Sequence, residues 1–235
     1  MISPTVRKKN SLAKSLLPSF SAEMKKYEDL YQLYVNEGYT KNLCEQYADA
    51  FIDNAKKPAP EDILQLAELY DGIHDTKTAE FYLENLADKK LSGDEKFRYC
   101  LDSLKIMSKR GHWRDAVDFR TENINFMQNY AQKKSQREFA QMCIALALTD
   151  CASRKYIGAF KLLNFGYKPQ GKSDVMLLEI FITAIYIYYC SGDKDNLASA
   201  VLTAQRYLKI FSNFEFSWTK AYYEQRIEDA ANGII

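Results

Sequence analysis

The stretch from Lys109 to Ala116 reads KRGHWRDA, and it decides how the rest of the chain is interpreted. It holds one of the two histidines and one of the two tryptophans of the 235 residues, which suggests a binding site. Gly111, however, is the residue type that ends a helix in the left-handed backbone conformation, and Ala116 lies where a second helix would begin. No second histidine accompanies His112. We therefore predict a turn between two helices, with the Trp113 ring packed between them.

The same pattern of helix, short polar turn and helix is predicted five times. The five expected hairpins cover Met24–Lys56, Pro60–Ala87, Phe97–Met127, Ala140–Asn164 and Leu178–Phe211. A small or aliphatic residue recurs where each second helix begins, at intervals of 36, 37, 43 and 38 residues: Leu43, Ala79, Ala116, Ala159 and Leu197. The turns are expected near Gly38, His74, Gly111, Arg154 and Gly192.

The composition agrees with an all-α protein. Hydrophobic residues make up 47% of the chain and aromatic residues 14%, so the chain can bury a substantial core. Nine glycines and five prolines are few for this length, and runs that alternate with period two are scarce. Residues 214–235 predict one more helix, which would cap the array. We expect residues 1–22 to form a flexible basic tail and residues 23–235 a single helical domain.

The hairpins resemble the tetratricopeptide repeat. That family combines a small residue and an aromatic residue in the first helix with glycine, an aromatic residue and alanine across the turn. The third hairpin matches with Leu104, Met107, Gly111, Trp113 and Ala116. The resemblance covers about Met24 to Phe211, and it implies a superhelical array of antiparallel hairpins, an α-solenoid. The intervals exceed the family period of about 34 residues, which leaves other α-solenoids and a closed helical bundle as alternatives.

The cysteines and the apolar runs indicate the cellular compartment in which the protein is expected. The five cysteines are odd in number, widely spaced and without a CxxC motif, so neither a disulfide framework nor a zinc site is predicted. No secretory signal is recognised at the start of the chain. The most apolar run, Val175–Cys190, is shorter than the ~20 residues of a membrane span and contains Glu179, so it predicts a buried central helix. We expect a cytoplasmic protein without a membrane partner.

The sequence lacks the motifs of metal and nucleotide chemistry. HExxH, ExxH pairs, the phosphate-binding GxxxxGK[ST] loop and GxGxxG do not occur. Asp115 and Asp118 are three residues apart, but acids in a first helical turn usually complement the helix dipole. We therefore predict no cofactor, no metal and no enzymatic activity.

Charge is divided unevenly along the chain. Residues 28–95 carry 6 basic and 16 acidic residues, a net charge of −10, whereas residues 96–172 carry 15 and 6, a net charge of +9. If the resemblance holds, the first helix of each hairpin lines an inner groove that binds extended or helical peptides. The side chains expected to face that groove are Glu61, Glu68 and Asp71 from the second hairpin and Arg98, Lys105 and Lys109 from the third.

These observations favour a non-enzymatic protein interaction scaffold or adaptor that binds a peptide segment of a partner in its concave groove. A regulatory sensor for a small peptide or apolar ligand is the alternative, and a helical enzyme has the least support. Nucleic-acid binding is not expected, because no base-stacking motif accompanies the basic segments. The identity of the partner and the oligomeric state stay open.

Overall fold

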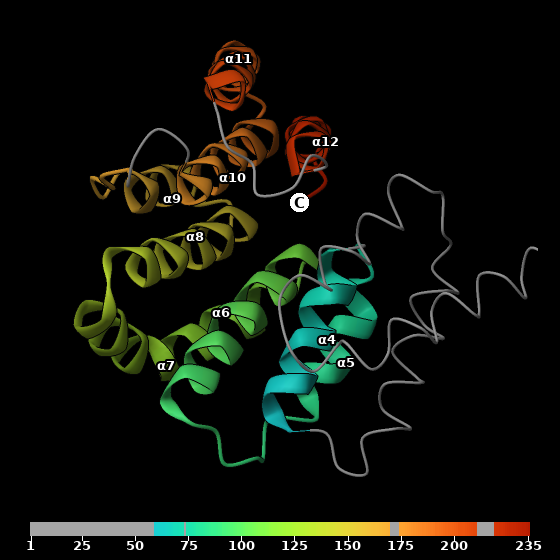
Figure 1. The fold of residues 1–235 in the computed structure, drawn as a ribbon, viewed down its shortest axis with the longest axis vertical. Helices are drawn as coiled ribbons and strands as arrows, with labels where there is room; N and C mark the ends of the chain where they lie inside the picture. Colours follow the sequence, from blue (N-terminus) through green and yellow to red (C-terminus); the bar gives the residue numbers. More distant parts are fainter. Residues whose placement is uncertain (1–58, 73, 170–173, 211–218) are drawn as a thin grey trace, which may run out of the picture. The chain divides into compact units, whose positions relative to one another are not determined.

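The computed structural model describes residues 59–72, 74–169, 174–210 and 219–235. All regular secondary structure in these residues is α-helical, which confirms the all-α prediction (Figure 1). The expected tail over residues 1–22 and the expected first hairpin, Met24–Lys56, lie outside the described residues. The chain divides into two compact units, Met1–Glu95 and Lys96–Ile235. The single domain expected over residues 23–235 stays a prediction.

The described part of the first unit is a helical hairpin of α4 (Pro60–Gly72) and α5 (Thr76–Glu84). Proline is well suited to the first position of α4, since the backbone N–H that it lacks would have no partner inside the helix. Glu61 and Asp62 follow in the first turn, where carboxylates complement the helix dipole. The two helices pack through apolar side chains and through stacked rings of Tyr70 and Tyr82, with centroids 5.5 Å apart.

The second unit contains the remaining described helices, a succession of hairpins followed by a single C-terminal helix (Figure 1). They are α6 (Gly93–Lys109, whose first residues precede the unit boundary), α7 (Trp113–Lys134), α8 (Gln136–Ala152), α9 (Tyr156–Leu163), α10 (Val175–Ser191), α11 (Lys194–Ile210) and α12 (Thr219–Ala231).

Helix α8 lies at the centre of this unit. Every residue from Met142 to Cys151 is buried. One side of the helix, including Met142 and Leu146, joins a core cluster with α6 and α7. The other side, including Ile144 and Leu148, joins a second cluster with α9 and α10. Helix α8 therefore contributes buried side chains to two core clusters, one on each side of the helix.

Helix α10 is buried in the same two-sided way, which confirms the prediction for the run Val175–Cys190. Met176, Ile180 and Ile187 face the cluster shared with α8 and α9. Leu178 and Ile182 face a third cluster, to which α11 contributes Leu208 and α12 contributes Ile227 among others. The C-terminal helix predicted within residues 214–235 is therefore present from Thr219, and it packs against α10 and α11.

The turns of four hairpins share one backbone geometry. His74 and Arg154 have φ of 61° and 60°, and Gly111 and Gly192 both have φ of 75°. In each turn the next residue donates its N–H to the carbonyl five residues earlier, at distances of 2.9, 2.7, 2.9 and 3.1 Å for Asp75, Lys155, His112 and Asp193. This bond is characteristic of the Schellman motif that ends helices.

The second helix of each hairpin also begins in the same way. The carbonyl of the residue after the left-handed position accepts a hydrogen bond from the residue four positions further on, at 2.9 to 3.1 Å. The donors are Ala79, Ala116, Ala159 and Leu197. These are the positions from which the repeat interval was measured in the sequence. Four of the five predicted turns are therefore confirmed, and Gly38 lies outside the described residues.

Candidate functional site

The turn at KRGHWRDA is confirmed as a turn, but the predicted packing of Trp113 is wrong. His112 is the N-cap residue of α7, and Trp113 is the first residue of that helix. The Trp113 side chain is 43% exposed, and the Arg114 guanidinium lies 5.1 Å from its ring centroid. Trp113, at the first position of α7, projects beyond the hairpin core. The residue that fills this core is Ala116, which is fully buried.

The predicted acidic residues lie together on α4. Glu61, Glu68 and Asp71 are spaced by seven and three residues, which places them on one side of the helix. All three are half-buried. The amide of Gln65 donates to Glu61 Oε1 at 3.2 Å. Hydrogen bonding and partial burial therefore distinguish this acidic face of α4 from a fully solvated helix surface.

The predicted basic residues lie together on α6. Arg98, Lys105 and Lys109 are spaced by seven and four residues on one side of the helix, and all three are half-buried. Lys105 Nζ lies 3.4 Å from Oδ1 of Asp102, whose side chain is only 11% exposed. The structure thus brings three predicted residues together on each of two helices. These helices belong largely to different units, so a single six-residue site stays a prediction.

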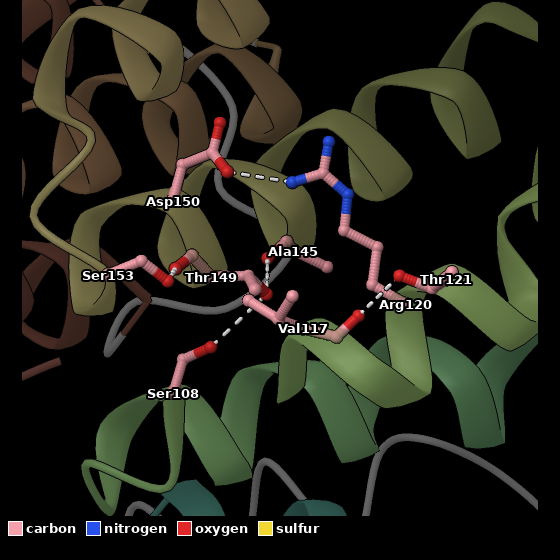
Figure 2. A network of polar contacts seen from close by, with 8 residues as sticks. All are labelled: Ser108, Val117, Arg120, Thr121, Ala145, Thr149, Asp150 and Ser153. Carbon is pink, nitrogen blue, oxygen red and sulfur yellow. Dashed lines mark hydrogen bonds and ion pairs between the residues drawn. The ribbon is translucent and has the colours of Figure 1, made fainter. Parts of the chain in front are cut away.

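A polar network that the sequence did not indicate crosses the second unit (Figure 2). Arg120 of α7 reaches Asp150 of α8, with Nη1 2.7 Å from Oδ1. The Ser108 hydroxyl of α6 donates to Thr149 Oγ1 at 3.2 Å, and Thr149 in turn donates to the carbonyl of Ala145 at 3.1 Å. Buried polar groups need such partners, so the network holds three helices in register. In the sequence, the feature that could have indicated this network is the pair Thr149 and Asp150, which interrupts the apolar run of α8.

A second polar cluster surrounds Asp174, the N-cap residue of α10. Its carboxylate accepts hydrogen bonds from the Met176 N–H at 2.9 Å and from the Tyr167 hydroxyl at 2.8 Å, while its own N–H donates to the Tyr207 hydroxyl at 3.1 Å. Burial, together with the bond to Asp174, raises the pKa of Tyr167 to about 12. The phenol therefore keeps its proton at neutral pH, and the cluster fixes the start of α10.

The buried thiols fall into two groups. Burial raises the pKa of Cys100 to about 12 and that of Cys143 to about 11, so both are packing residues without nucleophilic character. Cys151 and Cys190 instead lie in the cluster that α8, α9 and α10 share, where the neighbouring Cys190 and burial raise the pKa of Cys151. Since these residues are 39 positions apart, their membership of one cluster was not evident from the sequence.

The chain has no significant match among protein-family models, curated proteins or solved structures. The resemblance to the tetratricopeptide repeat rests on the residues quoted above, and it stays a prediction.

Two features are absent from the part of the chain that the structure describes. No group of three or more His, Cys, Asp and Glu side chains there is arranged to hold a metal ion. None of the helices described is both long and apolar enough to cross a bilayer.

Proposed function

We propose that the chain is a non-enzymatic interaction scaffold of helical hairpins that binds a peptide segment of a protein partner through the charged faces of its first helices. The observation that carries the proposal is the turn geometry repeated in four consecutive hairpins. Repetition of one hairpin unit is typical of arrays that present a continuous binding surface. A tetratricopeptide-like superhelix is part of this proposal.

The packing within the second unit supports such an array. Helices α8 and α10, the first helices of successive hairpins, pack directly against each other. Each also contacts the second helix of the same hairpin, α9 and α11 respectively. Stacking of hairpins through their first helices is how a repeat protein buries faces that one hairpin would leave exposed.

The charged faces suggest the chemistry of the partner. The acidic face of α4 would attract a basic segment, and the basic face of α6 would attract an acidic one. The ion pair with Asp102 already restricts the Lys105 side chain. Lys105 therefore loses less conformational entropy when a partner binds to it. We therefore expect each face to select its own partner segment, one rich in Lys and Arg for α4 and one rich in Asp and Glu for α6. The free cysteines among the described residues support a reducing, cytoplasmic location.

The experiment is affinity capture followed by mass spectrometry, with the whole chain as bait. Wild type is compared with the double variant Lys105→Gln and Lys109→Gln, which removes two charges from α6. The matched control is Lys194→Gln and Lys209→Gln on α11, where both lysines are exposed. The partner should be retained by wild type and by the control but reduced several-fold with the α6 variant. Equal recovery with all three baits would contradict the assignment of α6 to the binding surface.

A further inference from the structure

The turns of the third and fourth hairpins carry exposed apolar side chains. We call Gly111–Asp115 the third tip and Arg154–Gly158 the fourth tip; each runs from the left-handed residue into the first turn of the next helix. Trp113 is exposed in the third tip, and Ile157 is 76% exposed in the fourth. A single exposed apolar side chain is common on a protein surface, but these two occupy successive turns.

The two tips lie at the same end of the second unit. Ser108 precedes Gly111 by three residues, and Thr149 precedes Arg154 by five. The Ser108 and Thr149 hydroxyls are 3.2 Å apart, so α6 and α8 end within about two residues, or about 3 Å of helix, of each other. Figure 2 shows Ser108 and Ser153 on the same side of the polar network, where each chain segment enters its turn.

Asp150 of α8 provides a second link between the two hairpins. One carboxylate oxygen is paired with Arg120 of α7 at 2.7 Å. The other would lie 2.8 Å from a Cβ atom added to Gly158, at the start of α9. The same carboxylate thus lies beside the helices that follow both tips, which makes the tips neighbours in space.

The exposed charges of the two tips are mostly basic. Arg114 and Asp115 are exposed in the third tip, and Arg154 and Lys155 are exposed in the fourth. The Arg114 guanidinium lies 5.1 Å from the centroid of the Trp113 ring, so a cation accompanies the apolar side chain. Together the tips form a surface of apolar groups surrounded by cations.

The fifth hairpin shows that its turn geometry does not require such residues. Its turn, Gly192–Asn196, has the same left-handed start as the fourth tip. Lys194 and Asp195 stand where the fourth tip has Tyr156 and Ile157. The apolar side chains of the fourth tip are therefore not needed to form the turn.

The residue before the second helix also differs between the hairpins. In the second and fifth hairpins, Asp75 and Asp193 accept hydrogen bonds from backbone N–H groups of that helix. His112 and Lys155 occupy this position in the third and fourth tips and make no side-chain cap bond. A cation beside the N-terminus of a helix is unfavourable, because that end carries partial positive charge. Residues that reduce local stability in this way are expected at functional sites.

We propose that the third and fourth tips bind the surface of an anionic phospholipid bilayer. Trp113 and Ile157 enter the boundary between headgroups and acyl chains, where apolar side chains are removed from water. Arg114, Arg154 and Lys155 contact the phosphates and carboxylates of the headgroups, as basic residues do at the cytoplasmic leaflet.

Ile157 favours a bilayer over other anionic partners. An aliphatic side chain has no ring on which a nucleic-acid base could stack. A projecting tip does not enclose a peptide, and a Cβ atom added to Gly111 would have no neighbour within 4 Å. Two neighbouring tips can instead meet a flat surface together, and insertion buries both apolar side chains.

The sequence did not predict this contact. The expectation of no membrane partner was based on runs long enough to span a bilayer, and binding to the membrane surface needs no such run. The inference is independent of the proposed peptide binding, because it concerns the tips and not the charged faces of α4 and α6.

The test measures binding of the full chain to vesicles of phosphatidylcholine, alone or mixed with an equal amount of phosphatidylserine. Trp218→Phe leaves Trp113 as the one tryptophan of the chain. At low salt, we expect about tenfold more protein to sediment with the anionic vesicles than with the neutral ones. The Trp113 emission should shift to shorter wavelength and should be quenched by lipids brominated in their acyl chains. Binding through another part of the chain would leave Trp113 in water and unquenched.

Variants test the two kinds of contact separately. Arg154→Gln with Lys155→Gln should lower binding to anionic vesicles about tenfold, since each removes a cation from the lipid surface. Ile157→Ser should lower it several-fold, since insertion would no longer bury an aliphatic side chain. All three side chains are exposed, so circular dichroism and thermal unfolding should match those of wild type.

Matched controls lie on α11. Lys194→Gln with Lys209→Gln removes two exposed charges, and Leu202→Ser removes an aliphatic side chain that is 52% exposed. These controls should bind as wild type does. Equal binding to neutral vesicles, equal losses in the tip and control variants, or an unquenched Trp113 would overturn the proposal. A Trp113 response to soluble polyglutamate or to an oligonucleotide, without vesicle binding, would also overturn it and assign the tips to an acidic macromolecule.

Discussion

His74 and Arg154 adopt the left-handed backbone conformation that Gly111 and Gly192 adopt in the equivalent turns. This conformation costs a residue with a Cβ atom roughly 1–2 kcal/mol, whereas glycine takes it without steric penalty. The chain therefore tolerates strain in two turns because the hairpin requires that geometry at each junction. The absence of glycine at these turns in the sequence did not prevent the turn from forming.

Replacing Arg154 by glycine should stabilise the protein. Arg154 is exposed, so we expect relief of backbone strain to outweigh the extra freedom of the unfolded chain by about 0.5–1 kcal/mol. The measurement is the free energy of unfolding in urea. Gly192→Ala is the matched control: a Cβ atom there has no neighbour within 4 Å, so only the backbone cost of about 1 kcal/mol should appear. Loss of stability in Arg154→Gly would show that the arginine side chain contributes more than the strain.

Trp113→Ala should cost only about 1 kcal/mol of stability. A tryptophan packed between helices would cost about 3–5 kcal/mol, but this ring is 43% exposed at the start of α7. Leu104→Ala in the same hairpin is the comparison, because Leu104 is fully buried and should cost about 2–5 kcal/mol. Thermal or urea unfolding distinguishes the two, and equal losses would contradict the exposed position of Trp113.

At the scale of helices, α8 and α10 differ in how well the sequence predicted them. The run Val175–Cys190 was predicted as a buried helix because it is continuously apolar. Helix α8 is the more completely enclosed of the two over Met142–Cys151, although Thr149 and Asp150 interrupt its apolar run. Its burial depends on neighbours that cover both sides, and on Arg120 and Ser108, which satisfy its polar groups.

Removing Arg120 should weaken the attachment of α7 to α8. Arg120→Ala would leave the carboxylate of Asp150, 9% exposed, without its ion pair, and we expect a loss of about 2 kcal/mol. Arg114→Ala is the control on the same helix: Arg114 is exposed, so its loss should be below about 0.5 kcal/mol. Urea unfolding of both variants measures the difference. Similar values would mean that the pair between Arg120 and Asp150 contributes little.

At the scale of the whole molecule, the uneven charge distribution predicts salt-sensitive binding. The segments with net charges of −10 and +9 create opposite fields, and such fields act mainly on the rate of encounter. With the partner that affinity capture identifies, Lys105→Gln and Lys109→Gln should slow association several-fold at low salt and flatten its salt dependence. Dissociation should change less.

Glutamine is the appropriate replacement because Lys105 lies beside the nearly buried Asp102. Reversal to glutamate would place two carboxylates together and combine a loss of stability with a change in binding. The exposed pair Lys194 and Lys209 again supplies the control. An unchanged association rate at low salt would show that the α6 lysines do not steer the partner.

The sequence by itself determined the helices and the turns between them. Helical periodicity, caps and the Schellman geometry depend on residues within one or two turns of each other, so local patterns suffice to predict them. This is why the junctions near His74, Gly111, Arg154 and Gly192 were predicted at the right residues, including the two without glycine.

Only the tertiary structure decided which helices cover each other and which side chains meet. Trp113 faces solvent because the hairpin core is closed by Ala116, and α8 is enclosed because α6, α7, α9 and α10 all reach it. The contacts of Arg120 with Asp150 and of Ser108 with Thr149 join residues 30 and 41 positions apart. Contacts at such separations follow from the packing of helix faces, and a local pattern does not contain the position of the opposing face.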